Sequence, residues 1–186
     1  MARGTRDKMV ASATEVLRER GLTGTSFDRV LEHSGAPRGS VRHHFPGGKS
    51  EMIQAAVDRA GNEVTARLSS AIDRGATAAQ LVEGVCDYFG KWLLRSDYHA
   101  GCPVAAVAQE GYGDPALRDS TAAALGRWVD ILASSLRDED RSTGDADELA
   151  AMCVAAIEGA IMMARVQRSL TPLEATSKQL RILLHR

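Results

Sequence analysis

Apolar residues recur every three to four positions along nearly the whole chain, which is the spacing of one face of an α-helix. No stretch shows the sustained alternation, rich in Val, Ile and aromatic residues, that predicts a β-strand. The pattern therefore predicts an all-α protein of about nine helices. They are expected at residues 5–20, 26–33, 37–44, 49–74, 77–95, 102–110, 115–138, 146–169 and 172–185.

Residues 26–33 and 37–44 form two short predicted helices that are joined by a tight turn. Thr25 or Ser26 can cap the first helix with a side-chain oxygen. Pro37 suits the first turn of the second helix, where a backbone N–H would have no partner inside the helix. This spacing is typical of a helix-turn-helix, in which one helix braces a second in the major groove of DNA.

Charge is distributed unevenly along the chain. Residues 1–60 contain ten Lys and Arg against seven Asp and Glu, whereas residues 61–186 contain thirteen against seventeen. A basic N-terminal part on an acidic body favours a module that binds nucleic acid. We therefore expect a helix-turn-helix DNA-binding domain at residues 1–48 and a ligand-sensing and dimerisation domain at residues 49–186.

Other function classes find little support in the sequence. There is no phosphate-binding glycine loop, GxSxG or HExxH motif, so we expect no enzyme. Cys86, Cys102 and Cys153 form no CxxC pair, and we expect no metal and no cofactor. No apolar run near the N-terminus predicts a signal peptide or membrane anchor, so we expect a cytoplasmic protein. A helical protein-interaction adaptor that does not bind DNA is the alternative function.

An ordered series of motifs lies within residues 5–55. It comprises Thr25-Ser26-Phe27, Val30, Ser34-Gly35-Ala36-Pro37-Arg38-Gly39-Ser40-Val41, His43-His44-Phe45 and Lys49-Ser50-Glu51-Met52. These motifs resemble the signature of the tetracycline-repressor (TetR) family, and residues 36–40 and 44–49 resemble its LmrA/YxaF-like branch. The resemblance implies a dimer that binds an operator in double-stranded DNA, usually as a repressor, and that responds to a small-molecule effector.

The resemblance also implies which residues of the helix-turn-helix contact DNA. The residues expected near phosphates are Thr25, Ser26, Gly39, His44 and Lys49. The residues expected near base edges are Arg38, Ser40 and His43. Arg42 departs from the family, which usually has an aromatic residue at this position, and we expect it to contact a phosphate or a base. Arg3 and Arg6 either form an arm that reaches the minor groove or belong to a solvated terminus.

Large apolar side chains are concentrated between residues 77 and 169, which favours a ligand pocket with a few polar anchors. The residues expected to contact the effector are Tyr88, Phe89, Trp92, Cys102, Gln109, Trp128, Met152 and Met163. The alternative is that the aromatic and Met side chains simply form the core. Cys102, at an expected helix start, is either a redox-sensitive thiol or a packed structural one.

The last two predicted helices have small and aliphatic residues at helical spacing, as in a bundle between subunits. The residues expected at the interface of a homodimer are Cys153, Ile157, Ala160, Ile161, Ala164, Leu180 and Leu184. The alternative is that these stripes complete the core of a single protomer. A twofold dimer would read a pseudo-palindromic operator, with half-sites separated by whole turns of the double helix.

Overall fold

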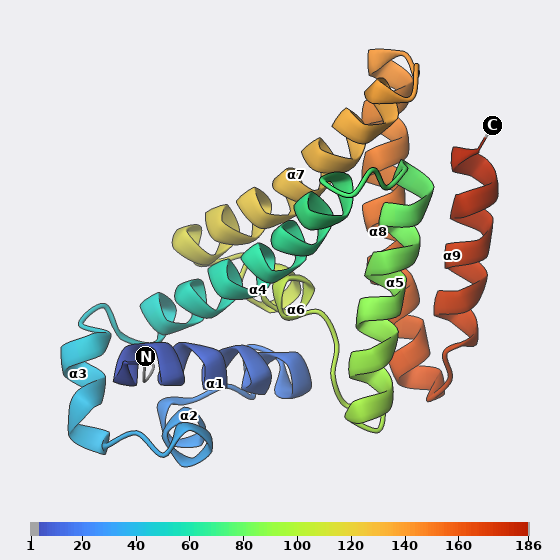
Figure 1. Cartoon of the computed structure of the whole chain (residues 1–186). Coiled ribbons are helices and arrows are strands. Elements are labelled where there is room, and N and C mark those ends of the chain that lie inside the picture. The colour runs from blue at the N-terminus through green and yellow to red at the C-terminus, as the bar shows by residue number, and fades with distance from the viewer. Residues whose placement is uncertain (1–3, 186) are drawn as a thin grey trace. The chain divides into compact units, whose positions relative to one another are not determined.

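The computed structural model describes residues 4–185, and every regular element in that range is helical (Figure 1). The elements are α1 (Thr5–Arg20), α2 (Phe27–Ser34), the 3₁₀ turn η1 (Arg38–Ser40), α3 (Val41–His44), α4 (Gly48–Ile72), α5 (Ala78–Arg95), α6 (Pro103–Glu110), α7 (Pro115–Asp138), α8 (Thr143–Gln167) and α9 (Thr171–Leu184). The prediction of an all-α fold is confirmed.

Two predicted helix starts are wrong, and local hydrogen bonds explain both. Pro37 has an extended backbone (ψ 135°) and precedes the helix instead of opening it. Its carbonyl accepts hydrogen bonds from the N–H and the hydroxyl of Ser40 (2.9 and 2.6 Å), which closes a tight turn before α3. Helix α8 begins at Thr143, three residues earlier than expected, because the Ser142 hydroxyl caps it by accepting from the N–H of Asp145 (3.3 Å).

The described chain forms two compact units. Unit 1 contains residues 4–62 and 103–124, and unit 2 contains residues 63–102 and 125–185. Helices α4 and α7 each contribute residues to both units. Compactness shows which residues pack together but not which bind DNA or ligand, so the functional division after residue 48 stays a prediction.

Unit 1 is built around one apolar face of α1, which packs against α2 and α6. Its buried apolar side chains include Met9, Ala13, Leu17, Val30, Phe45, Met52, Ile53, Ala56, Val104 and Val107. The Thr14 hydroxyl donates to the carbonyl of Val10 (2.9 Å) and lies 3.3 Å from that of Ala56, so a polar contact also links α1 to α4. The core of the helix-turn-helix therefore includes the first half of α4.

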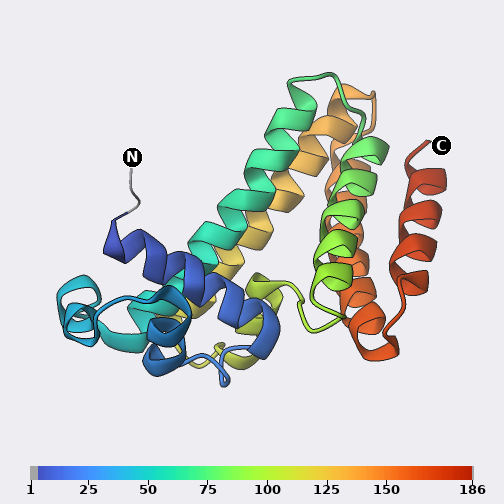
Figure 2. The same ribbon diagram turned by 60° about the horizontal axis from the view of Figure 1, so that its bottom comes forward.

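In unit 2, helices α5, α8 and α9 lie side by side (Figures 1 and 2). All seven residues predicted for the dimer interface are buried there, at most 6% exposed: Cys153, Ile157, Ala160, Ile161, Ala164, Leu180 and Leu184. Neighbouring helices of the same protomer cover these side chains, so they have no free surface for a second protomer. Their positions fit the alternative, in which the stripes complete the core of one protomer.

The outward faces of α8 and α9 are also partly apolar. Helix α8 is long and apolar enough to cross a membrane by length and composition alone, and its inward face packs against α5 and α9. Large exposed apolar side chains on the two helices are Met152, Met162, Met163, Val166 and Ile182. Large apolar side chains that are exposed on neighbouring helices make these faces a candidate interaction surface.

Candidate functional site

The turn between α2 and α3 has the geometry of a helix-turn-helix. The Ser26 hydroxyl accepts a hydrogen bond from the N–H of Arg29 (3.4 Å) and caps α2. Gly35 ends α2 with a φ of 65°, in the left-handed region where a side chain would be strained, and its N–H donates to the carbonyl of Leu31 (2.9 Å). The chain thereby reverses direction within a few residues and presents η1 and α3 at the surface.

Most of the predicted DNA-contacting residues lie on the surface of this motif. Those that are exposed are Arg38, Gly39, Arg42, His43 and Lys49, and those that are half-buried are Ser26, Ser40 and His44. Thr25 differs, because it is completely buried. Its hydroxyl donates to the carbonyl of Gly21 (2.7 Å) and its N–H donates to that of Leu22 (3.1 Å). Thr25 therefore holds the α1–α2 connection and has no side-chain surface for a phosphate.

Arg38 pairs with a partner that the sequence did not reveal, the carboxylate of Asp28 on α2. Both side chains are more than 70% exposed. An ion pair so open to water contributes little to stability, so the guanidinium can exchange Asp28 for another anion at low cost. The Lys49 ammonium, at the start of α4, donates to the carbonyl of Leu22 (3.0 Å), which places its charge beside the α1–α2 connection.

Arg6 and the two adjacent histidines of the motif each contact other side chains. Arg6 lies in α1, where its guanidinium is 4.0 Å from the Glu51 carboxylate and 5.3 Å from the centroid of the Phe45 ring. Arg3 lies outside the described residues. The rings of His43 and His44 contact each other at 4.9 Å between centroids, and the described chain contains no group of three or more potential metal ligands.

Helix α6 is fastened to the α1–α2 connection through Glu110. Its carboxylate accepts from the N–H groups of Leu22 (3.3 Å) and Thr23 (2.7 Å). Partial burial raises the pKa of Glu110, but these hydrogen bonds and the nearby Lys49 charge outweigh it and lower the pKa below its ordinary value of 4.5. No local sequence signal identified this contact, since its partners are nearly ninety positions apart.

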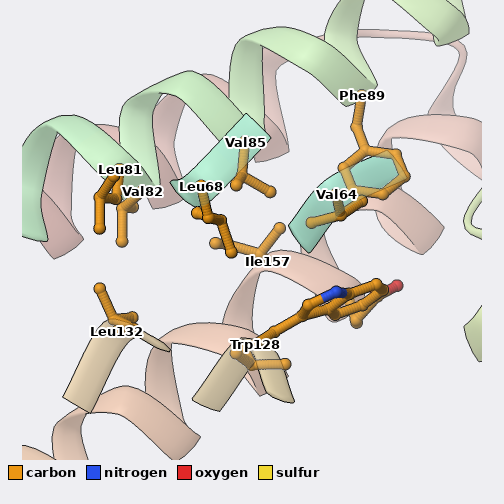
Figure 3. A pocket seen from close by; sticks show the side chains of 11 residues that line it. Val64, Leu68, Leu81, Val82, Val85, Phe89, Trp128, Leu132 and Ile157 are labelled. Carbon is orange, nitrogen blue, oxygen red and sulfur yellow. The ribbon is translucent and has the colours of Figure 1, made fainter. Parts of the chain in front are cut away.

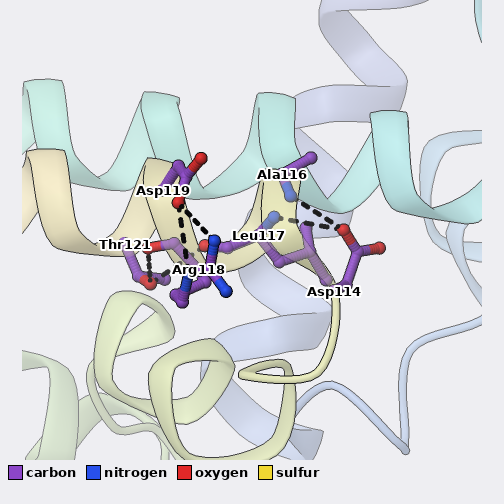
Figure 4. A network of polar contacts seen from close by, with 6 residues as sticks. All are labelled: Asp114, Ala116, Leu117, Arg118, Asp119 and Thr121. Carbon is purple, nitrogen blue, oxygen red and sulfur yellow. Dashed lines mark hydrogen bonds and ion pairs between the residues drawn. The ribbon is translucent and has the colours of Figure 1, made fainter.

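A second polar contact fastens the start of α7 to α4. Asp114 caps α7 by accepting from the N–H groups of Ala116 (3.0 Å) and Leu117 (3.4 Å), as Figure 4 shows. Its other oxygen accepts from the Ser50 hydroxyl (2.6 Å), and this hydrogen bond lowers the pKa of Asp114. The Asp114-Pro115 pair was a readable helix-start signal, but its partner on α4 was not.

Removing the Glu110 charge is expected to destabilise unit 1 by about 1 kcal/mol, because two backbone donors lose a charged acceptor. The pKa of Glu110 is lowered in the folded protein, so its contribution is fully present above pH 4.5 and is lost as the pH falls through the lower folded value. Urea unfolding of Glu110→Gln at several pH values measures this. Glu32→Gln, an exposed carboxylate on α2, is the control. Equal stability of both variants near neutral pH would contradict the prediction.

Unit 2 contains a cavity between the second half of α4, α5, α7 and α8 (Figure 3). Its lining residues are Val64, Leu68, Leu81, Val82, Val85, Phe89, Trp128, Leu132, Val154, Ile157 and Glu158. The free space is about 30 Å³, enough for one or two water molecules. A ring-sized effector would therefore have to move these side chains apart.

Only Phe89 and Trp128 of the predicted effector contacts line this cavity. Two of the others, Met152 and Met163, are exposed on α8. Gln109 is exposed on α6 and belongs to unit 1. On α5, the cavity lining does not include Tyr88 or Trp92. The Tyr88 ring is 5.0 Å from that of Phe89 and is stacked by the Arg67 guanidinium at 4.2 Å. The residues of the predicted set therefore do not share one location.

The cysteines are buried, including Cys102. Burial raises the pKa of Cys86 and of Cys153 to about 11, so both thiols stay protonated near neutral pH. The Cys102 thiol hydrogen-bonds to the carboxylate of Glu158, a cavity residue that sequence reasoning missed. The signal for Glu158 was present as the single charge in the apolar run from residue 149 to residue 164.

Comparisons with known proteins agree with this geometry. The family model described as bacterial regulatory proteins of the TetR family matches residues 10–56. The model of the C-terminal domain of LmrA/YxaF-like transcriptional regulators matches residues 78–179. A helix-turn-helix-type transcriptional regulator of Mycobacterium tuberculosis is 41% identical over 188 residues, which cover 97% of this chain and 94% of the relative. The regulator LmrA of Bacillus subtilis is 26% identical, with 91% and 90% covered.

Solved structures show the same fold. The regulatory protein TetR of Rhodobacter sphaeroides superimposes with a TM-score of 0.84 at 21% identity and covers 95% of this chain and 97% of its own. A TetR transcriptional regulator of Chloroflexus aurantiacus gives a TM-score of 0.78 at 26% identity, with 98% and 94% covered. With the helix-turn-helix described above, these similarities show that the chain belongs to the TetR family of DNA-binding transcriptional regulators and has a C-terminal domain of the LmrA/YxaF-like type.

Proposed function

We propose that this regulator is a cytoplasmic, homodimeric repressor that binds a pseudo-palindromic operator and is released from it by a small apolar or aromatic molecule. The observation that carries the proposal is the exposure of Arg38 and Arg42 on the helix-turn-helix and of Lys49 at the start of α4. Exposed cations at the end of a braced short helix suit both the phosphates and the base edges of a major groove. A catalytic role is not part of the proposal.

Each exposed residue of the motif has a role that its position supports. Arg38 and His43 reach base edges, together with the half-buried Ser40, and Arg38 exchanges Asp28 for DNA. The residues that contact phosphates are Ser26, Gly39, His44 and Lys49. Arg42 adds a charge where an aromatic side chain is usual in the family, so it binds a phosphate or reads a base that relatives do not.

A second protomer is expected to cover the outward faces of α8 and α9. Met162, Met163 and Val166 are about half exposed or more on α8, and Ile182 is 44% exposed on α9. Burying such side chains against a symmetric copy removes apolar surface from water and needs no complementary partner of another kind. This interface replaces the buried stripes that the sequence suggested.

Helix α4 supports a route from effector to operator. It supplies Ile53 and Met52 to the core of unit 1, and Val64 and Leu68 to the cavity of unit 2. An effector that enlarges the cavity favours a conformation with α4 displaced, and it shifts the equilibrium only by its different affinities for the two conformations. A tenfold loss of operator affinity needs about 1.4 kcal/mol of such coupling.

Selection of genomic DNA fragments on the purified protein tests the proposal. We expect one pseudo-palindrome to be enriched, and its affinity to fall steeply with salt. Arg38→Ala and Arg42→Ala should each weaken operator binding by about 1–3 kcal/mol. A variant that has lost a phosphate contact should bind all DNA sequences equally more weakly, and the slope of log affinity against log salt concentration should fall by about one. Arg95→Ala, an exposed arginine on α5, is the control and should bind normally. A folded dimer that enriches no sequence would instead support the adaptor function.

A further inference from the structure

The cavity of unit 2 contains one carboxylate in an otherwise apolar wall. Ten of its lining residues have aliphatic or aromatic side chains, and the remaining one is Glu158. Glu158 keeps some exposed surface as a residue, but its Oε2 is buried and has no hydrogen-bond partner in the described chain. Cys102 hydrogen-bonds to the carboxyl group. A residue of the cavity lining therefore has one strong acceptor that is unused.

This arrangement costs the protein stability. A buried carboxylate without a paired cation loses its hydration and gains little in return, which is why burial raises the pKa of Glu158 to about 7 although the Cys102 hydrogen bond lowers it. A Gln or Leu at this position would avoid the cost of a buried charge. A costly polar group in an apolar pocket is the usual form of an anchor that orients a ligand.

The wall also shows which charge the cavity accepts. No Lys, Arg or His lines it, so an anionic ligand would meet only the Glu158 carboxylate. The Phe89 and Trp128 rings both point into the cavity (Figure 3), and aromatic faces attract cations. A cation on the ligand therefore meets a carboxylate and aromatic faces, whereas a neutral donor leaves the carboxylate charge uncompensated.

We infer that the effector is a lipophilic monocation, with an apolar body that enlarges and fills the cavity and one protonated amine that donates a hydrogen bond to Oε2 of Glu158. The inference rests on the proposed function, because it names the ligand class that this site senses. Charge-assisted hydrogen bonds are about twice as strong as neutral ones. The protonated amine therefore provides most of the difference in affinity between this ligand and a neutral compound of the same shape.

Calorimetric binding to the full-length protein without DNA tests the ligand class. The probes are apolar primary amines of increasing size, each with its matched alcohol and hydrocarbon. We expect at least one amine to bind about tenfold or more tightly than its alcohol and hydrocarbon, and Glu158→Gln to remove that advantage. Glu148→Gln, an exposed carboxylate on the same helix, should keep it.

Other outcomes would overturn the inference. These are no binding by any amine, an alcohol that binds as tightly as its amine, or an amine preference that survives in Glu158→Gln. The proposed function is judged separately by operator selection and by release of the operator. A neutral compound that releases the operator while no amine binds would leave the repressor proposal intact and refute the monocation. If no operator is enriched but an amine preference that depends on Glu158 is measured, the repressor proposal is refuted and the amine site stands.

Discussion

Phe45→Ala is expected to destabilise unit 1 by about 3–5 kcal/mol and to abolish operator binding. Phe45 is 2% exposed and directly follows α3, and its ring centroid lies 6.2 Å from that of Phe27. Helix α3 has only four residues and little stability of its own, so the packing of Phe45 holds it in place. Because a whole domain is stable by only about 5–15 kcal/mol, the predicted loss would unfold much of the helix-turn-helix.

Urea unfolding and operator binding of the same samples measure the Phe45 effect. Tyr112→Ala is the control, because Tyr112 is an aromatic residue of unit 1 that is 73% exposed, and its removal should change stability by less than about 0.5 kcal/mol. Phe45→Leu should recover part of the loss by refilling the space. A Phe45→Ala variant that is as stable as Tyr112→Ala would show that the ring does not hold α3 in place.

Glu158→Gln is expected to become progressively more stable than the wild type as the pH rises. The folded pKa of Glu158 is about 7, above its ordinary value of 4.5, so the folded state holds a proton that the unfolded state releases first. Its stabilising contribution is full below pH 4.5 and is lost as the pH rises through 7. The stability difference should therefore shift by about 3 kcal/mol in favour of the variant between about pH 4 and about pH 8.

Chemical unfolding of both proteins across this pH range measures the shift. Glu148→Gln, with its exposed side chain on α8, should follow the wild type at every pH. A constant difference between Glu158→Gln and wild type would show that the carboxyl group titrates alike in the folded and unfolded states. It would also remove the energetic reason for treating Glu158 as an anchor.

Local chemistry in the sequence determined the helices and the helix-turn-helix. The apolar spacing predicted α5 and α7 to within a residue. Thr25 or Ser26 was the expected cap of α2, and Ser26 caps it, by chemistry that depends on near neighbours only. Family motifs around Arg38 and Lys49 then indicated DNA binding. Such features are readable because each depends on residues a few positions apart.

Tertiary structure decided what each helical face contacts. An apolar stripe on α8 shows that the face is covered, but not whether α5 and α9 or a second protomer covers it, so Ile157 and Ile161 were placed at a dimer interface and lie in the core. Glu158 and Glu110 gained their roles from partners distant in the chain. Helical periodicity in the sequence indicates that a residue is shielded from water. Which segment shields it is determined only in the packed fold, because distant segments meet through the sum of many weak contacts.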